Sequence, residues 1–437
     1  MLVAIGRAAF VRVAVPDCNE QRIMTIVRRG LILALGLLMP ALLAAATAAA
    51  PLAMLAAAPA APAAPAVPVD AVAPAAATAP ATASASAATW RPEHIVIVVL
   101  ENKTGGQVLG NKDMPYLNEL AATGALMTNA YFAQTPYTGD SPAGLPARPS
   151  QPNYLYLLSG NNQGVLPPWM KGIGNDLIPA AMRPFATPNL GAALIAGGFS
   201  YTGFSESLPH PHYDAPGDMS LLKDEYRRKH NPTINWVNLT GATVPADKAR
   251  YVLPVATNLA FTSTRDPVDG KSYRGFVMDE AGRALGYDQL PTVSLVVPNE
   301  QNDAHSGTNK ACDAWLVANI KPYADWARAH NSLLVVTYDE DGSTNTSRGD
   351  GYRTGIDRIA TIFYGPPERV VGGKYPETID HLNVLATLLD RYGLLVQFKT
   401  DFAASYNTAE ALIEAANLRP LKDVFGEGAA LAEQTAK

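Results

Sequence analysis

The fold is decided by the stretch His94–Leu100, which reads HIVIVVL and is followed at once by Glu101 and Asn102. Such a nearly continuous run of β-branched residues is typical of a strand that is buried on both faces of a sheet. The runs at 292–297 (TVSLVV) and 333–338 (LLVVTY) repeat this pattern. The three runs therefore predict buried strands of a parallel sheet.

Segments with the apolar spacing of helices lie between and beyond these strands. The predicted helices cover 114–123, 151–159, 188–196, 310–329 and 381–392, and one more strand is predicted at 358–364. Strands that alternate with helices predict an α/β fold, with a mostly parallel central sheet and helices on both faces. We interpret residues 90–437 as a single domain, in which the stretch 200–285, rich in Pro, Asn and Asp, is a loop-rich insertion over the active face.

Composition and charge exclude several classes of protein. Of the 437 residues, 48% are hydrophobic and 17% are charged, which excludes a disordered or collagen-like chain. The formal net charge of −5 argues against a nucleic-acid partner, because phosphate binding needs a basic surface. The only two cysteines, Cys18 and Cys312, exclude a disulfide framework and a cysteine-based zinc site.

The first 50 residues are interpreted as a secretory signal region. Arg28 and Arg29 precede a Leu- and Ala-rich run that small residues follow, as in a signal that is removed after export. A permanent anchor is the alternative, and Pro40 with the Ala-rich tail favours cleavage over it. Residues 51–89 contain 20 Ala and 7 Pro and are interpreted as an extended linker. We therefore expect a secreted or periplasmic protein without a stable membrane span after signal removal.

Polar residues directly follow two of the predicted strands. Glu101 and Asn102 come after the first run, and Asp339, Glu340 and Asp341 come after the third. In an open parallel sheet, ligands bind beyond the carboxyl ends of the strands. Taken singly, each group is better explained as a helix cap or a turn. Taken together, their carboxylate and amide oxygens favour a hard divalent cation.

Two further positions are candidates for chemistry. Ser150 stands directly before the predicted helix at 151–159, which is typical of a helix N-cap and also suits a nucleophile. From the segment alone, the helix cap is the favoured interpretation. Among the seven histidines, His305 follows the strand at 292–297 and is expected on the active face, whereas His94 and His330 are interpreted as structural.

Several motifs succeed one another along the chain: Glu101-Asn102, Ser150-Gln-Pro-Asn-Tyr, Lys229-His-Asn-Pro, Asn302-Asp303-x-His305, Thr337-Tyr-Asp-Glu340 and His381. In this order they resemble the motifs of the bacterial phosphoesterase family that joins acid phosphatases and non-toxin phospholipases C. The resemblance spans about residues 92–395, and it implies a fold related to that of alkaline phosphatase for the catalytic domain.

The resemblance also implies a metal site. Its implied ligands are Glu101, Asn102, Asp339 and Glu340, with Ser150 as the nucleophile and a further metal contact. The expected ion is calcium, magnesium or manganese, since all three prefer oxygen ligands and the ligand type does not separate them.

The remaining site residues are assigned by the same resemblance. His230, His305 and His381, with Asp303, are implied to line the phosphate and to handle its charge and protons. Substrate binding is predicted for Asn153 and Arg148. Relatives often have His where this chain has Arg148. An arginine at this position can clamp a phosphate oxygen but is a poor proton donor.

The predicted function is an exported, metal-dependent phosphoesterase, like an acid phosphatase, that hydrolyses phosphate monoesters through a serine nucleophile. A phospholipase C-type phosphodiesterase and, from another class, a non-catalytic envelope binding protein are the alternatives. The substrate would be a phosphorylated small molecule or a phospholipid headgroup. The sequence does not define the oligomeric state.

Overall fold

The computed structural model describes residues 89–133, 150–166, 172–217, 225–342, 358–406, 408–421 and 423–426. All of them belong to one compact unit, Thr82–Lys437. The predicted signal region and all but the last residue of the predicted linker lie outside the described residues, as does Arg148.

An eight-stranded sheet forms the centre of this unit, with the strand order β10-β2-β9-β8-β1-β7-β3-β4. Its strands are β1 (His94–Leu100), β2 (Ala125–Ala130), β3 (Tyr201–Ser205), β4 (Asn258–Ala260), β7 (Val293–Val297), β8 (Ser332–Tyr338), β9 (Thr361–Tyr364) and β10 (Gly373–Ile379). A separate hairpin joins β5 (Thr264–Arg265) to β6 (Ser272–Tyr273).

The sheet is mostly parallel, as the sequence predicts. Strand β1 lies between β7 and β8 and is parallel to both, so that Ile95 is level with Val293 on one side and Leu333 on the other. Among the described strands of the central sheet, only β9 runs antiparallel to its neighbours, β8 and β2. The side chains of β7 and β8 are buried throughout, which explains why their sequences are mostly apolar.

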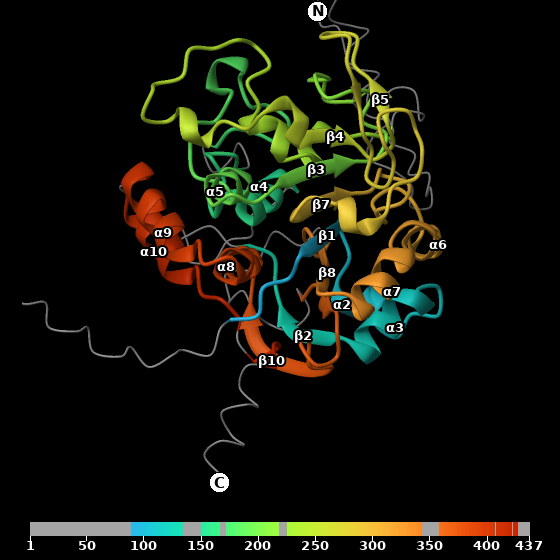
Figure 1. Ribbon diagram of the computed structural model, residues 1–437. Helices are drawn as coiled ribbons and strands as arrows, with labels where there is room; N and C mark the ends of the chain where they lie inside the picture. Colours follow the sequence, from blue (N-terminus) through green and yellow to red (C-terminus); the bar gives the residue numbers. More distant parts are fainter. Residues whose placement is uncertain are drawn as a thin grey trace, which may run out of the picture. The chain divides into compact units, whose positions relative to one another are not determined.

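Helices cover both faces of the sheet (Figure 1). On one face lie α4 (Gln151–Ser159), α5 (Leu190–Ala196), α8 (His381–Arg391), α9 (Leu395–Ser405) and α10 (Ala409–Asn417). On the other lie α2 (Gly105–Val108), α3 (Pro115–Thr123), α6 (Asn309–Asn319) and α7 (Lys321–Ala329). The α/β architecture predicted from the sequence is therefore confirmed.

Two sequence predictions need correction. The single helix predicted at 310–329 is two helices, α6 and α7, which meet at Ile320 because Pro322 in the first turn of α7 has no N–H to continue the ladder. The stretch 200–285, interpreted as an insertion, contributes β3 and β4 to the central sheet. Its other described residues between and after these strands form loops, short 3-10 turns and the β5–β6 hairpin.

None of the described helices combines the length and the apolar character needed to cross a membrane.

Candidate active site

The carboxyl ends of β1 and β8 bring two buried carboxylates to one place. Glu101 follows β1 and Asp339 follows β8, and both side chains are fully buried. Asn102 bridges them, since its backbone N–H donates to Asp339 Oδ1 at 2.9 Å and its Nδ2 donates to Glu101 Oε2 at 2.9 Å. Asn102 has a φ of 54°, which asparagine tolerates better than most residues. Gly342 packs so closely that a Cβ there would overlap the carbonyl oxygen of Asn102.

Ser150 directs its hydroxyl into this cluster. It occupies the N-cap position of α4, yet its side chain makes no capping hydrogen bond. Instead its Oγ donates to Glu101 Oε2 at 3.1 Å. The interpretation of Ser150 as a side-chain cap is therefore wrong, and the hydroxyl lies among groups suited to activate it.

The second oxygen of Glu101 contacts an aromatic pair. Tyr154 donates its hydroxyl to Glu101 Oε1 at 2.7 Å, and His230 Nε2 lies 3.1 Å from the same oxygen. The two rings are stacked with centroids 5.4 Å apart. On its other side, His230 Nδ1 lies 3.7 Å from Asp303 Oδ2. The predicted residues Glu101, His230 and Asp303 thus share one cluster, in which one ligand atom from each lies within 4.8 Å of the others.

The buried carboxylates of this cluster repel one another. Burial, together with repulsion from Asp339 and Asp303, raises the pKa of Glu101 well above its ordinary value. Burial likewise raises the pKa of Asp303 and of Asp339. Asp339 Oδ2 and Asp303 Oδ2 are buried without a hydrogen-bond partner among the described residues. Buried, unpaired carboxylate oxygens are costly unless a cation binds them, so this donor set fits a hard divalent ion.

The histidines differ in exposure and contacts. Of the three predicted site histidines, His305 is the most accessible, with 31% of its side chain exposed, and its Nδ1 lies 3.1 Å from Ser306 Oγ. Its ring centroid is 5.9 Å from that of His230. Burial lowers the pKa of His305, although Glu300 opposes the shift. Burial also lowers the pKa of His230 well below its ordinary value.

His381 lies beneath the cluster rather than in it. It begins α8 after the capping residue Asp380, and its Nε2 lies 2.8 Å from the backbone carbonyl oxygen of Asp339. Burial lowers its pKa to about 4. The ring is therefore neutral near neutral pH, and the observed contact positions Asp339.

The predicted site residues Glu340 and Asn153 are both buried. Glu340 is buried next to Asp339, at the end of β8. Asn153 is buried, and its Oδ1 accepts a hydrogen bond from the backbone N–H of Ala133 at 3.1 Å, which ties α4 to the segment after β2.

Sequence reasoning assigned no role to Tyr154, Lys229 or Lys103. Lys229 lies within a quoted motif, is partly buried, and makes no ion pair among the described residues, yet its charge lowers the pKa of Glu101 and of His230. Lys103 is half-buried and donates to the carbonyl oxygen of Ala304 at 2.6 Å. Position within a motif was the only signal for Lys229, and nothing in the local pattern distinguished Lys103.

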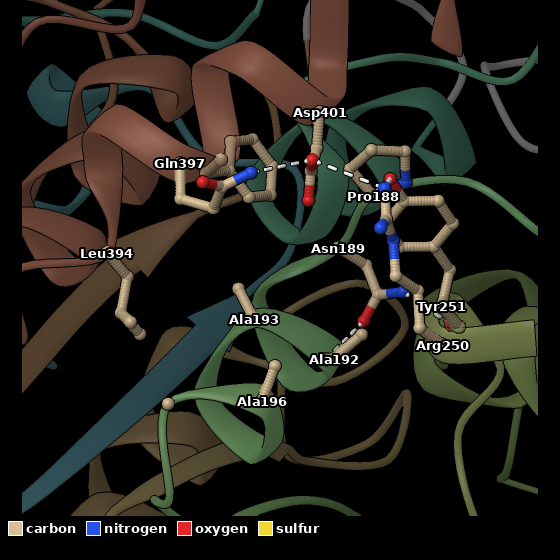
Figure 2. A pocket seen from close by; sticks show the side chains of 12 residues that line it. Pro188, Asn189, Ala192, Ala193, Ala196, Arg250, Tyr251, Leu394, Gln397 and Asp401 are labelled. Carbon is tan, nitrogen blue, oxygen red and sulfur yellow. Dashed lines mark hydrogen bonds and ion pairs between the residues drawn. The ribbon is translucent and has the colours of Figure 1, made fainter. Parts of the chain in front are cut away.

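A pocket between α5, Tyr251 and α9 is separate from these residues (Figure 2). Ala192, Ala193 and Ala196 of α5 form one wall, and the pair of Arg250 and Asp401 stands at 3.3 Å. None of the predicted site residues lines it, so it offers no chemistry to the cluster.

Comparison with known proteins places the chain among phosphate-ester hydrolases. The model of the phosphoesterase family matches residues 107–395. A phosphatidylinositol-3-phosphatase from Mycobacterium tuberculosis is 34% identical over 334 residues, which are 76% of this chain and 83% of that protein. A phosphate-repressible acid phosphatase from Penicillium chrysogenum is 24% identical over 64% of this chain and 54% of its own length. Among solved structures, a protein in the alkaline phosphatase superfamily from Vibrio parahaemolyticus is similar with a TM-score of 0.40 and 13% identity, over 70% of this chain and 67% of that one.

Proposed function

The chain belongs to the phosphoesterase family and is a hydrolase of phosphoric esters, and on that premise we propose that it is an exported, metal-dependent phosphatase with Ser150 as its nucleophile. The observation that carries the proposal is the hydrogen bond from Ser150 Oγ to Glu101 Oε2, inside a cluster of buried carboxylates with unpaired oxygens. A serine hydroxyl next to a buried base and a cation site is a common arrangement for an activated nucleophile.

Five residues would hold the divalent ion. They are Glu101, Asn102, Asp339 and Glu340, with Ser150 as a further contact. When bound, the ion supplies positive charge that favours the ionised serine and stabilises the negative charge of the phosphate. Calcium, magnesium and manganese all suit this oxygen-rich donor set.

Residues of the chain supply the other functions. Glu101 Oε2 accepts a hydrogen bond from Ser150 Oγ, and this contact fixes the orientation of the hydroxyl for attack on a bound ester. Lys229 and Lys103 provide positive charge for the phosphate, and Lys229 is available because no described acid pairs with it. Ser150 Oγ then passes its proton to Glu101 Oε2 and attacks phosphorus in line with the departing alcohol oxygen, so that a phosphoserine forms as the bond from phosphorus to that alcohol breaks.

We assign two proton transfers to His305, one to the leaving alcohol and one from the water that hydrolyses the phosphoserine. Its ring is the most exposed of the three predicted histidines, so it can reach a leaving group, and protonated His305 gives its proton to the departing alcohol oxygen. Neutral His305 then takes a proton from the water that attacks the phosphoserine, and Glu101 returns its proton to Ser150 Oγ as the bond from that oxygen to phosphorus breaks. His381 has a positioning role, because it contacts the backbone of Asp339 from within the core.

Phosphate monoesters are the proposed substrates, including phosphorylated lipid headgroups. Two observations support this choice over a phosphodiesterase. Both curated relatives described above are named phosphatases, and the more similar one is named for a phosphorylated inositol lipid. Export is proposed from the signal-like pattern of residues 24–50.

The test uses purified protein lacking residues 1–88, with nitrophenyl phosphate and the matching bis-nitrophenyl diester as substrates, each with and without a chelator. We expect chelator-sensitive hydrolysis of the monoester, and a loss of about 10³-fold or more in kcat/KM in Ser150→Ala. Ser159→Ala is the matched control, since Ser159 lies in the same helix and bonds only to backbone carbonyls and Gln163. Full activity in Ser150→Ala would exclude the nucleophile, and a preference for the diester would favour the phosphodiesterase.

A further inference from the structure

A second cluster of metal-binding side chains lies outside the candidate active site. His210 and His212 belong to the turn that follows β3, whereas Asp266 and Asp269 belong to the β5–β6 hairpin. We propose that His210, His212, Asp266 and Asp269 form a second, structural metal site of zinc type, which holds the loop that carries His230.

The two imidazoles meet at one carboxylate. His212 Nδ1 lies 2.5 Å from Asp266 Oδ2, and His210 Nδ1 lies 3.3 Å from Asp266 Oδ1. His210 Nδ1 is buried and makes no hydrogen bond among the described residues. Two ligand atoms of a tetrahedral zinc ion are about 3.3 Å apart, so the spacing of His210 and Asp266 is that of two zinc ligands. Atoms of His212, Asp266 and Asp269 lie within 4.8 Å of one another.

The carboxylates are held in place before any ion binds. The side chain of Asp266 is fully buried, and its Oδ1 accepts a hydrogen bond from the backbone N–H of Val268 at 2.9 Å. Asp269 is fixed from both sides, because its Oδ1 accepts from the backbone N–H of Lys271 and its Oδ2 accepts from the Tyr273 hydroxyl at 2.6 Å. Ligands fixed in this way lose little freedom on binding, which favours affinity.

The donor atoms identify the class of ion. Imidazole nitrogen suits zinc and its transition-metal neighbours, whereas calcium and magnesium take oxygen ligands. His212, Asp266 and Asp269 supply three of the four ligands that are usual in structural zinc sites, and His210, whose Nδ1 lies 3.3 Å from Asp266 Oδ1, is the proposed fourth. The site therefore differs in kind from the oxygen-rich cluster around Glu101.

A short chain of hydrogen bonds connects this site to His230. The Asn258 side chain donates to the carbonyl oxygen of Pro211, between the two histidines, at 2.8 Å. Its Oδ1 accepts from Asn231 Nδ2 at 2.7 Å, and Asn231 follows His230 directly. An ion that fixes the turn at Pro211 therefore also restrains the backbone that carries His230.

The test measures zinc bound to the full chain after removal of metal by chelation and dialysis against micromolar zinc. All samples carry Asp339→Asn, which disables the candidate catalytic metal site. We expect His212→Gln to bind one zinc fewer per chain, and Asp269→Asn, at an exposed turn, to bind that zinc at least about 10-fold more weakly. His330→Gln is the matched control, because the ring of His330 stacks on Trp326 and forms no ion pair with a carboxylate among the described residues. Circular dichroism of each variant establishes that it is folded.

A second measurement tests the structural role. Zinc should slow amide hydrogen exchange across residues 227–231, and His212→Gln should abolish this protection. Equal zinc content in His212→Gln and in the His330→Gln control would overturn the site. Zinc binding that leaves exchange at 227–231 unchanged would overturn its connection to His230. If Asp269→Asn stays folded and binds zinc with undiminished affinity, the four-ligand assignment fails.

Discussion

Replacement of Asp339 by asparagine should stabilise the metal-free protein while it abolishes activity. Asp339 is fully buried beside Glu101, and its Oδ2 has no hydrogen-bond partner among the described residues. In the absence of a cation, the two carboxylates repel each other, which is one reason why the pKa of Glu101 is raised. Asparagine keeps the oxygen that accepts from the Asn102 backbone and removes the charge.

The expected rise in the free energy of unfolding follows from the repulsion between the carboxylates of Glu101 and Asp339. Both carboxylates contact Asn102, at 2.9 Å each. For a separation on the order of 5 Å, their charges would repel by about 3 kcal/mol at an effective dielectric constant of about 20. Allowing for the less favourable fit of the new amide, the free energy of unfolding should rise by about 1–3 kcal/mol. With metal the order reverses, because an ion at 1,000 times its Kd stabilises the wild type by about 4 kcal/mol and the variant hardly at all.

Urea denaturation followed by circular dichroism tests this, in chelator and in excess calcium, magnesium or manganese. The raised pKa of Glu101 means that the repulsion is present at high pH and is relieved as the pH falls through that pKa. The advantage of Asp339→Asn in chelator should therefore shrink from pH 8 to pH 5. Asp313→Asn is the control, since the carboxylate of Asp313 accepts from the backbone of Tyr116 and Leu117 and its loss should destabilise. A metal-free Asp339→Asn that unfolds more easily than the wild type would refute the reasoning.

His305→Gln should slow hydrolysis of alkyl phosphates about 10²–10⁴-fold and affect nitrophenyl phosphate much less, because a nitrophenolate leaves without a proton; equal losses on both substrates would argue against a proton donor. Since burial lowers the pKa of His305, the protonated acid accumulates only as the pH falls below about 6.5, so wild-type kcat for alkyl phosphates should rise toward acidic pH, and this rise should be absent in His305→Gln. Lys229→Met should lower kcat/KM about 10- to 100-fold and weaken inhibition by inorganic phosphate, whereas Lys248→Met on the 3-10 turn before Tyr251 should change neither. His381 has a pKa of about 4 in the folded protein against an ordinary 6.5, so between these values the unfolded chain binds a proton that the folded chain does not, and the free energy of unfolding falls as the pH falls through that window. Between pH 7 and pH 5, the free energy of unfolding of His381→Gln should therefore fall by about 2 kcal/mol less than that of the wild type. Equal falls for both proteins in urea denaturation would contradict the burial of a neutral ring.

The centre of the sheet could be predicted because burial on both faces selects for nearly continuous runs of apolar, often β-branched residues, as in β1, β7 and β8. Strand β3 has the sequence YTGFS and β2 has ALMTNA, and neither contains such a run. These strands form because the neighbouring strands offer hydrogen bonds, which is a property of the fold and not of the segment. The edge strand β10 was missed for the same reason, and its Pro376 accompanies a shift in register.

The candidate site could be predicted to the level of strand ends and motifs, and no further. Glu101 and Asp339 were expected together because the carboxyl ends of parallel strands share one edge. That Ser150 donates to Glu101 and does not cap its helix depends on a side-chain rotation. The contacts of Tyr154 and the free charge of Lys229 depend on packing between segments distant in sequence. The prediction for Arg148 falls outside the described residues.

The close approach of Gly342 to Asn102 bears on how new specificities could arise on this scaffold. The backbones at these two positions are in contact, which fixes the distance between the residues after β1 and those after β8. Any side chain at position 342, which also has a φ of +67°, would increase that distance. Libraries that seek altered substrate range should therefore hold Asn102 and Gly342 constant, so that the spacing between the residues after β1 and those after β8 is kept.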